Sequence, residues 1–75
     1  MHFQHFMPGQ LIALNEEISD AQAQGYGLTC EDPRGKLECK VVYEVSGIDV
    51  RRWASRVYVL GVEGCFNSAC FHAIS

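Results

Sequence analysis

The chain has 75 residues, which is enough for one small hydrophobic core and too few for two. Hydrophobic residues make up 48% and charged residues 20%, which is typical of a globular domain and excludes an intrinsically disordered chain. Nine acids against six bases give a formal net charge of -3, which disfavours nucleic acid and anionic membranes as partners. We therefore expect residues 1–75 to form a single small acidic domain.

The N-terminal residues lack the basic start and apolar run of a signal peptide, and no later segment is apolar enough to span a membrane. These features predict a cytoplasmic protein. In that compartment the four cysteines are expected to stay reduced. A homodimer is a further possibility, because a chain this short buries little surface on its own.

An amphipathic helix is predicted over residues 9–24. Its apolar residues recur at spacings of three, four and three: Leu11, Leu14, Ile18 and Ala21. Pro8 suits the start of a helix and Gly25 its end. Leu14 and Ile18 lie at the centre of the stripe, so we expect both to be buried. Residues 2–7 are rich in aromatic side chains and are expected to form a short strand.

Strands are predicted in the second half of the chain. Pro33 and Gly35 suit a chain reversal, after which apolar and polar residues alternate as in a half-buried antiparallel strand. Residues 49–55 fit either a helical turn or the start of a strand. A further reversal is expected at residues 64–68. The three strands predicted after residue 36 are 37–45, 56–62 and 69–74.

These elements predict an α+β domain in which one N-terminal helix packs on a four-stranded, mainly antiparallel sheet. The alternative is a ferredoxin-like βαββαβ order. That order requires residues 2–7 to form a central strand and residues 49–55 to form a second helix.

The side chains that bind zinc in other proteins are present: Cys30, Cys39, Cys65, Cys70, His2, His5 and His72. There is no Cys-x-x-Cys knuckle, and Cys39 is expected on the apolar face of its strand. We therefore expect reduced structural thiols and neither a metal nor another cofactor. If Asn67 and Ser68 form a two-residue hairpin loop, Cys65 falls opposite Cys70 at a separation that permits a disulfide.

A thiol enzyme would need a base beside its nucleophile, and the local pair with these properties is Cys70 and His72. No third group is evident to orient the histidine, so no catalytic residue is predicted. Trp53 and the tyrosines beside the arginines resemble a base-stacking surface in composition, but core packing is the expected role.

Charge is distributed unevenly along the chain. The first 33 residues hold five acids and no Lys or Arg, whereas residues 34–75 hold six bases and four acids. On the predicted helix, Glu16, Glu17 and Asp20 would share one solvent-facing side. Glu16 and Asp20 are like charges four residues apart, which does not stabilise a helix. We therefore expect these three residues to contact a basic partner.

The sequence thus predicts a non-enzymatic protein-binding module whose acidic face binds a basic surface on a larger protein or complex. By size and charge alone, it is analogous to small inhibitors of nucleic-acid-handling or host-defence complexes, such as the anti-CRISPR proteins of phages and mobile elements. No sequence motif connects it to such a family. The alternatives are a zinc-stabilised interaction module and a small Cys/His thiol enzyme.

Overall fold

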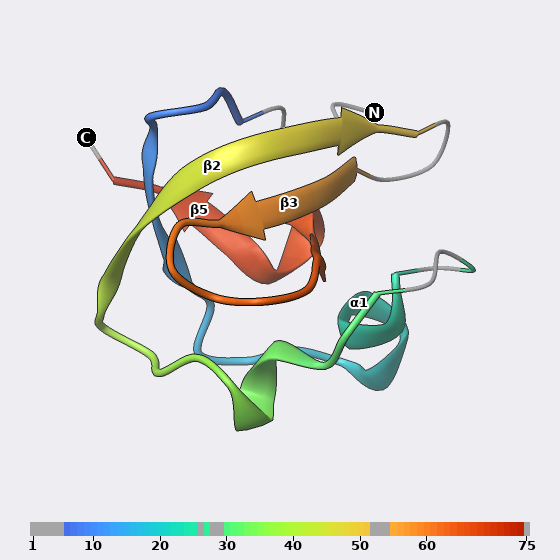
Figure 1. Cartoon of the computed structure of the whole chain (residues 1–75). Coiled ribbons are helices and arrows are strands. Elements are labelled where there is room, and N and C mark those ends of the chain that lie inside the picture. Colours follow the sequence, from blue (N-terminus) through green and yellow to red (C-terminus); the bar gives the residue numbers. More distant parts are fainter. Residues whose placement is uncertain (1–5, 26, 28–29, 52–54, 75) are drawn as a thin grey trace.

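The computed structural model describes residues 6–25, 27, 30–51 and 55–74. The strands are β1 (Leu11–Leu14), β2 (Val42–Val50), β3 (Ser55–Val59), β4 (Phe66–Asn67) and β5 (Phe71–Ala73). The helical elements are the α-helix α1 (Asp20–Gln24) and the 3-10 turns η1 (Pro33–Gly35) and η2 (Ser68–Cys70). The strands form one sheet in the order β4-β3-β2-β1-β5, so the protein is an α+β fold with little helix (Figure 1).

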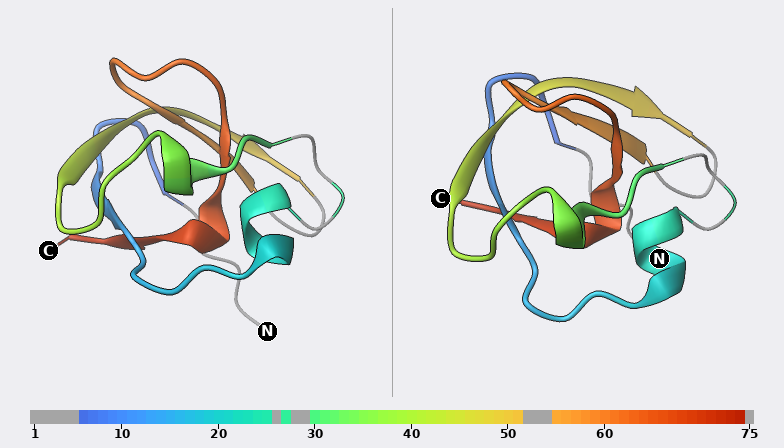
Figure 2. Two further views of the ribbon diagram at one scale, coloured as in Figure 1. Left: turned by 90° about the horizontal axis from the view of Figure 1, so that it is seen from below. Right: turned by 60° about the horizontal axis from the view of Figure 1, so that its bottom comes forward.

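β2 connects two parts of the sheet. Residues 42–44 pair with β1, whereas residues 45–50 pair with β3, and the register shifts between Val45 and Gly47. Such an irregularity bends a strand and increases its twist. The sheet therefore wraps around the core, and β5 passes behind β3 in Figure 1. The connection from β1 to β2, which carries α1 and η1, runs along one side of the sheet (Figure 2).

The core lies inside this curved sheet. Its buried members are Phe6, Ile12, Leu14, Leu37, Val45, Val57, Val59, Phe66, Cys70 and Phe71. Alternate residues of β1 and β3 supply four of them, as expected for side chains on one face of a strand. The rings of Phe66 and Phe71 pack edge to face, with centroids 6.3 Å apart. Burial of each such side chain contributes about 1.5–3 kcal/mol, which makes this cluster the main source of stability.

The helix expected over residues 9–24 is confirmed only over its last five residues, Asp20–Gln24, and is wrong before them. Residues 11–14 form β1, which lies between β2 and β5. Ile12, Ala13 and Leu14 are consecutive and at most 4% exposed, so both sides of the strand are covered. A strand buried on both faces carries a continuous apolar run, which by chance also matched helical spacing. Leu14 is buried as expected, and Ile18 packs partly buried against the core.

The helix that does form is short and has clear boundaries. The Ser19 side chain accepts a hydrogen bond from Gln22 N–H, and the Gln22 side chain accepts one from Ser19 N–H. This capping box starts α1 at Asp20, eleven residues later than expected. Gly25 ends the helix, as predicted, with a positive φ of 84°.

The described residues form a sheet of five strands, so the expected number of four is wrong. The strand predicted at residues 56–62 is confirmed in part as β3, which ends at Val59. The strand predicted at 37–45 begins only at Val42 and continues to Val50. The continuation includes the start of the ambiguous stretch 49–55, of which residues 52–54 lie outside the described part.

The ferredoxin-like alternative is also wrong. All four strand pairings are antiparallel, whereas βαβ units place parallel strands side by side. Among the described residues α1 is the only α-helix. Residues 6 and 7 are not in a strand, and the rest of the predicted strand at 2–7 lies outside the described residues.

The expected hairpin at Asn67 and Ser68 does not form. The Asn67 side chain accepts a hydrogen bond from Ala69 N–H at 3.1 Å and thereby caps η2. β4 then pairs with β3, and β5 pairs with β1. Cys65 and Cys70 are therefore not cross-strand neighbours. Within the described ranges, no helix is long and apolar enough to cross a membrane.

Candidate functional site

The three acids predicted to share a helix face do not do so. Glu16 and Glu17 precede α1, and only Asp20 belongs to it. Asp20 occupies the first turn, where the helix dipole stabilises a carboxylate. All three side chains are exposed. Their contact with a basic partner stays a prediction, but they do not form one continuous helical surface.

Arg34 joins α1 to η1 through an ion-pair network. Its Nη2 lies 2.9 Å from Asp20 Oδ1 and 2.6 Å from Asp32 Oδ2. Its Nη1 donates a hydrogen bond to the Ile18 carbonyl oxygen at 3.4 Å. The side-chain hydrogen bond from Arg34, and a second from its backbone N–H, lower the pKa of Asp32 to about 2. Asp20 therefore already has a cation beside it within the chain.

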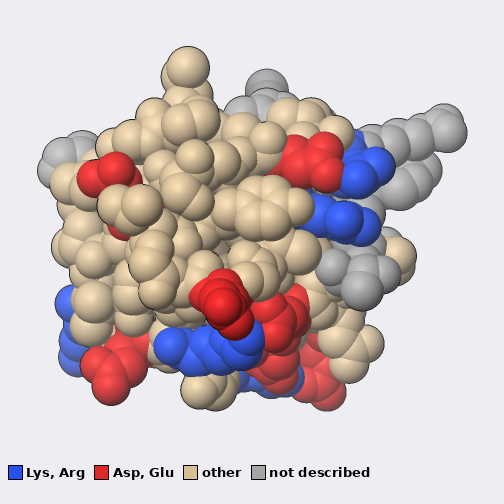
Figure 3. Space-filling model, viewed as in Figure 1, with Lys and Arg blue, Asp and Glu red and all other residues tan. Residues whose placement is uncertain are grey.

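Two more acids of the first 33 residues also meet bases. Lys36 Nζ lies 2.5 Å from Glu31 Oε1, and Lys40 Nζ lies 4.0 Å from Glu16 Oε1. Figure 3 shows acidic and basic side chains side by side along the lower part of one face. No base lies among the acids in the sequence, but the folded chain places bases beside them. The chain reversal at η1 brings the basic segment next to the acidic one. Glu17 has no ion pair among the described residues.

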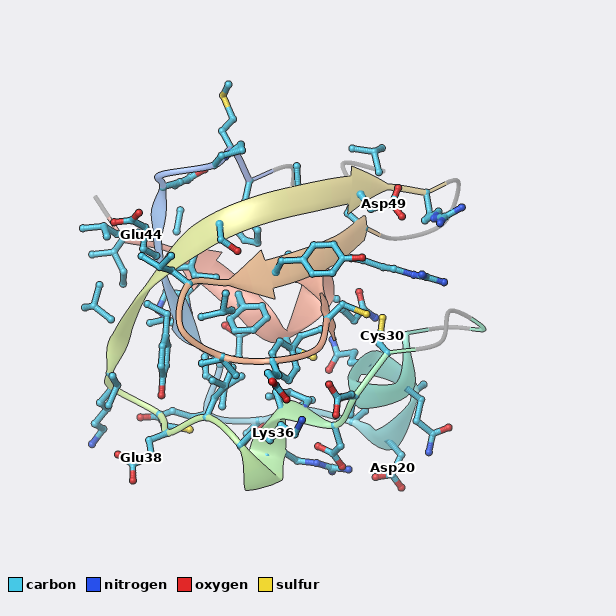
Figure 4. All side chains as sticks on the ribbon, in the orientation of Figure 1. Asp20, Cys30, Lys36, Glu38, Glu44 and Asp49 are labelled. Atoms are coloured by element: carbon cyan, nitrogen blue, oxygen red, sulfur yellow. The ribbon has the colours of Figure 1, made fainter. Side chains whose placement is uncertain are left out.

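Cys30 and Cys65 lie side by side. Glu31 N–H donates to the Cys65 carbonyl oxygen at 2.9 Å, which joins the segment after α1 to the residue before β4. The side chains of Cys30 and Cys65 share a hydrogen bond. Burial, followed by the proximity of Cys65, raises the pKa of Cys30 to about 11, and the nearby charge of Arg56 opposes this rise. Figure 4 shows the Cys30 sulfur beside a second sulfur atom.

The structure does not bring Cys70 and His72 together. Cys70 is fully buried, and its Sγ donates to the Gln22 carbonyl oxygen at 3.4 Å. Burial raises the pKa of Cys70 to about 12, so at neutral pH it is a thiol and a poor nucleophile. His72 is exposed, and its Nδ1 lies 2.7 Å from Asn15 Oδ1. The pair therefore lacks the contact that a thiol enzyme requires.

Metal ligands do not converge in the described part of the chain. No group of three or more His, Cys, Asp or Glu side chains there could hold a metal ion. Cys39, expected on an apolar face, is exposed, precedes β2, and donates from Sγ to the Asn15 carbonyl oxygen at 3.7 Å. His2 and His5 lie outside the described residues.

The outer face of the sheet is unusually apolar. Leu11 of β1 is paired with Glu44 of β2, and Leu60, which follows β3, donates its N–H to the Glu44 carbonyl oxygen at 2.9 Å. Cross-strand neighbours share a face, so Leu11, Glu44 and Leu60 form a row, with Val42 two residues away along β2. We call Leu11, Val42 and Leu60 the outer apolar face.

Members of the outer apolar face are well exposed: 44% for Leu11, 51% for Val42 and 61% for Leu60. The solvent side of an antiparallel sheet normally carries polar residues. Figure 4 labels Glu44 at the upper left, and in the same orientation the upper left of Figure 3 is largely uncharged. The sequence contained one signal for this surface, since Val42 falls among the polar positions of its strand.

The sequence matches no family model, and no curated protein or solved structure matches it either. The function proposed below is therefore supported by the chemistry and geometry of the described residues.

Proposed function

We propose that the chain is a non-enzymatic protein-binding module that docks through its outer apolar face. The observation that carries this proposal is the row of Leu11, Glu44 and Leu60 across the solvent side of the sheet. Exposed apolar groups of this kind, next to a charged residue, are typical of protein interaction sites. The acidic residues proposed from the sequence are mostly satisfied by bases of the same chain, so they support binding less well.

Glu44 selects the chemistry of the partner. A complementary surface would be apolar and would present a Lys or Arg side chain to the Glu44 carboxylate. A homodimer fits this face less well, because a two-fold contact centred on it brings one Glu44 carboxylate towards the other. The partner we propose is therefore a different protein with a basic residue inside an apolar patch. Inhibition of a nucleic-acid-handling or host-defence complex stays a prediction about the identity of that partner.

Capture from a lysate of the native host, with matched variants, tests the proposal. Leu60→Asp places a charge in the outer apolar face and should abolish capture of the partner. Val50→Asp is the control, because Val50 is similarly exposed, 58% against 61%, and lies at the other end of β2. It should capture the partner normally. Both positions are exposed, so both variants should change the unfolding free energy by about 0.5 kcal/mol or less.

A third variant separates the two candidate surfaces. Glu16, Glu17 and Asp20 are changed together to Gln, Gln and Asn, which removes their charge and keeps their shape. Capture should be retained if the outer apolar face binds. The proposal is refuted if this variant loses the partner while Leu60→Asp keeps it, or if Leu60→Asp and Val50→Asp bind equally.

The oligomeric state provides a second test. Sedimentation equilibrium of the purified protein should show a monomer, because the outer apolar face is proposed for a different protein. A dimer that is dissociated by Leu60→Asp would instead assign this face to self-association. A Glu44→Gln variant sharpens the result, since loss of the like charge would favour any self-association through the face.

A further inference from the structure

We propose that Cys30 and Cys65 are a modification site: they form a reversible intramolecular disulfide when a small disulfide such as oxidised glutathione is present. The bond would link the segment after α1 to the residue that precedes β4. This pairing differs from the one suggested by the sequence, which placed Cys65 opposite Cys70. It is independent of the protein-binding function proposed above.

The backbone holds these two cysteines together. The hydrogen bond from Glu31 N–H to the Cys65 carbonyl oxygen joins their neighbouring peptide groups at 2.9 Å. Gly64 adds a second contact: a Cβ atom there would overlap the Glu31 carboxylate, so the glycine leaves room for the Glu31 side chain. Residues 30–31 are thus in direct contact with residues 64–65. A disulfide needs neighbouring backbones and convergent side chains, and the influence of Cys65 on the Cys30 side chain indicates that the two lie close together.

The other two cysteines are less well placed. Cys39 is exposed and directed to the Asn15 carbonyl oxygen, next to the end of β1. Cys70 is the stronger alternative partner for Cys30, because the two thiols are close enough to influence each other's pKa. Its sulfur, however, is fully buried and donates a hydrogen bond to the Gln22 carbonyl oxygen. Cys30 and Cys65 are both partly exposed, which allows a small oxidant to reach them.

The exchange proceeds in two balanced steps. The Cys65 thiolate attacks one sulfur of oxidised glutathione, which forms a mixed disulfide and releases one glutathione thiolate. Cys30 then loses its proton to solvent, and its thiolate attacks Cys65 Sγ and expels the second glutathione. Two protein thiols are oxidised to a disulfide, and one glutathione disulfide is reduced to two thiols.

The order of the two steps follows from the environment of Cys30. Burial raises the pKa of Cys30 to about 11, so Cys30 is almost entirely a thiol at neutral pH and attacks slowly. In the second step it attacks a sulfur that is already adjacent, so a small thiolate fraction suffices. The Arg56 charge, which lowers the pKa of Cys30, favours that thiolate.

The experiment uses the folded protein in buffers with increasing ratios of oxidised to reduced glutathione. Samples are quenched with acid, their remaining thiols are alkylated, and the disulfides are mapped by mass spectrometry of peptides. We expect a Cys30–Cys65 bond at lower oxidant ratios than any other protein disulfide. Predominant mapping of Cys30 to Cys70 or Cys39, or no intramolecular bond at any ratio, would overturn the proposal.

Single variants test the roles of the two thiols. Cys30→Ser should accumulate the mixed disulfide on Cys65, whereas Cys65→Ser should acquire glutathione on Cys30 more slowly, because burial keeps Cys30 largely protonated. Cys39→Ser is the matched control and should form the Cys30–Cys65 bond as the wild type does. The reverse trapping pattern would refute the assigned order.

Thermal unfolding provides a readout that does not depend on mapping. Because the bond closes the loop between residues 30 and 65, the oxidised protein should melt roughly 5 °C or more above the reduced protein. Addition of reductant should reverse the shift, and Cys30→Ser should show none. A lower melting temperature in the oxidised state would mean that the bond distorts the fold, which contradicts the proposed placement of the two thiols.

Discussion

The residues under the sheet and those in the connection between β1 and β2 are held in place by different interactions. Val45, Val57 and Phe66 are 0% exposed and pack against one another inside the sheet. In the connection, the side chains of the Arg34–Asp20 ion pair are 42% and 82% exposed. Apolar burial depends little on salt, whereas ion pairs at the surface are screened by it. The connection also buries Ala23 and Leu37, so it combines apolar burial with ion pairs and is expected to be the more salt-sensitive of the two regions.

Asn67 lies where the two regions meet. It is 0% exposed, belongs to β4, and donates from Nδ2 to the Gln22 carbonyl oxygen of α1 at 2.8 Å. The same side chain caps η2. The buried Asn67 side chain thus attaches the connection to the sheet. Variants in the core, at this attachment and in the connection should therefore change the unfolding free energy by different amounts.

The largest effect is expected in the core. Phe66→Ala removes a fully buried ring and its edge-to-face contact with Phe71, which should lower the unfolding free energy by about 3–5 kcal/mol. Urea unfolding followed by circular dichroism measures this loss. Val42→Ala, on the exposed side of the sheet, is the control and should change it by about 0.5 kcal/mol. Similar losses of unfolding free energy for the two variants would show that Phe66 does not belong to the core.

The next effect is expected at the attachment. Asn67→Ala removes the amide donor to the Gln22 carbonyl oxygen, which keeps only the Cys70 thiol as a side-chain donor. It also removes the cap of η2, and the two losses together should cost about 1–3 kcal/mol. Hydrogen exchange should show a greater loss of protection in α1 than in β2, because the helix depends on this contact. Gln24→Ala, an exposed change in α1, should leave protection almost unaltered. Equal losses in α1 and β2 for Asn67→Ala would argue against an attachment role.

A smaller effect is expected from Gly64→Ala. Gly64 has a φ of +95°, and its new Cβ would displace the Glu31 carboxylate from its place beside Lys36. The left-handed backbone alone costs about 1–2 kcal/mol for a residue other than glycine. Gly35→Ala is the matched control, because it meets no atom within 4 Å and has no positive φ. It should be neutral or slightly stabilising, and a greater loss there than at Gly64 would contradict the comparison.

The smallest effect is expected from the exposed ion pairs, and it depends on pH. The pKa of Asp32 is lowered from 3.8 to about 2 in the folded protein, so its contribution is present above about pH 4 and is lost as the pH falls towards 2. Arg34→Gln removes the cause of this shift. The variant should lose less stability than the wild type over that pH range and should respond less to added salt. Unfolding curves measured at several pH and salt values test this. If the unfolding free energies of the wild type and Arg34→Gln changed equally with pH and salt, the ion pair would have no role.

Parts of the fold could be predicted from the sequence. The alternation after residue 36 indicated antiparallel strands, and β3 begins one residue before its expected start and ends three residues before its expected end. Gly25 was correctly placed as a helix end. The helical stripe failed at residues 11–14, because burial of both faces of β1 depends on β2 and β5, which no local pattern reveals. Ser19 and Gln22 did carry a local signal, since a capping box would have marked the true start of α1.

The candidate sites were harder to predict. Asp20 and Arg34 are 14 positions apart and meet only because η1 reverses the chain. Cys30 and Cys65 become neighbours through a backbone hydrogen bond between segments distant in sequence. Leu11 was assigned to a buried helical stripe, so its exposure beside Glu44 was missed once the helix had been misplaced. Long-range pairing decides all three cases.

The position of β1 between β2 and β5 has a consequence for synthesis of the chain. Leu14 is paired with Phe71, so the side of β1 that faces β5 stays unpaired until about residue 73 has emerged from the ribosome. Contacts between segments so distant in sequence form slowly, and an unpaired apolar strand can associate with other chains in the meantime. β1 is thus among the last of the described strands to be enclosed.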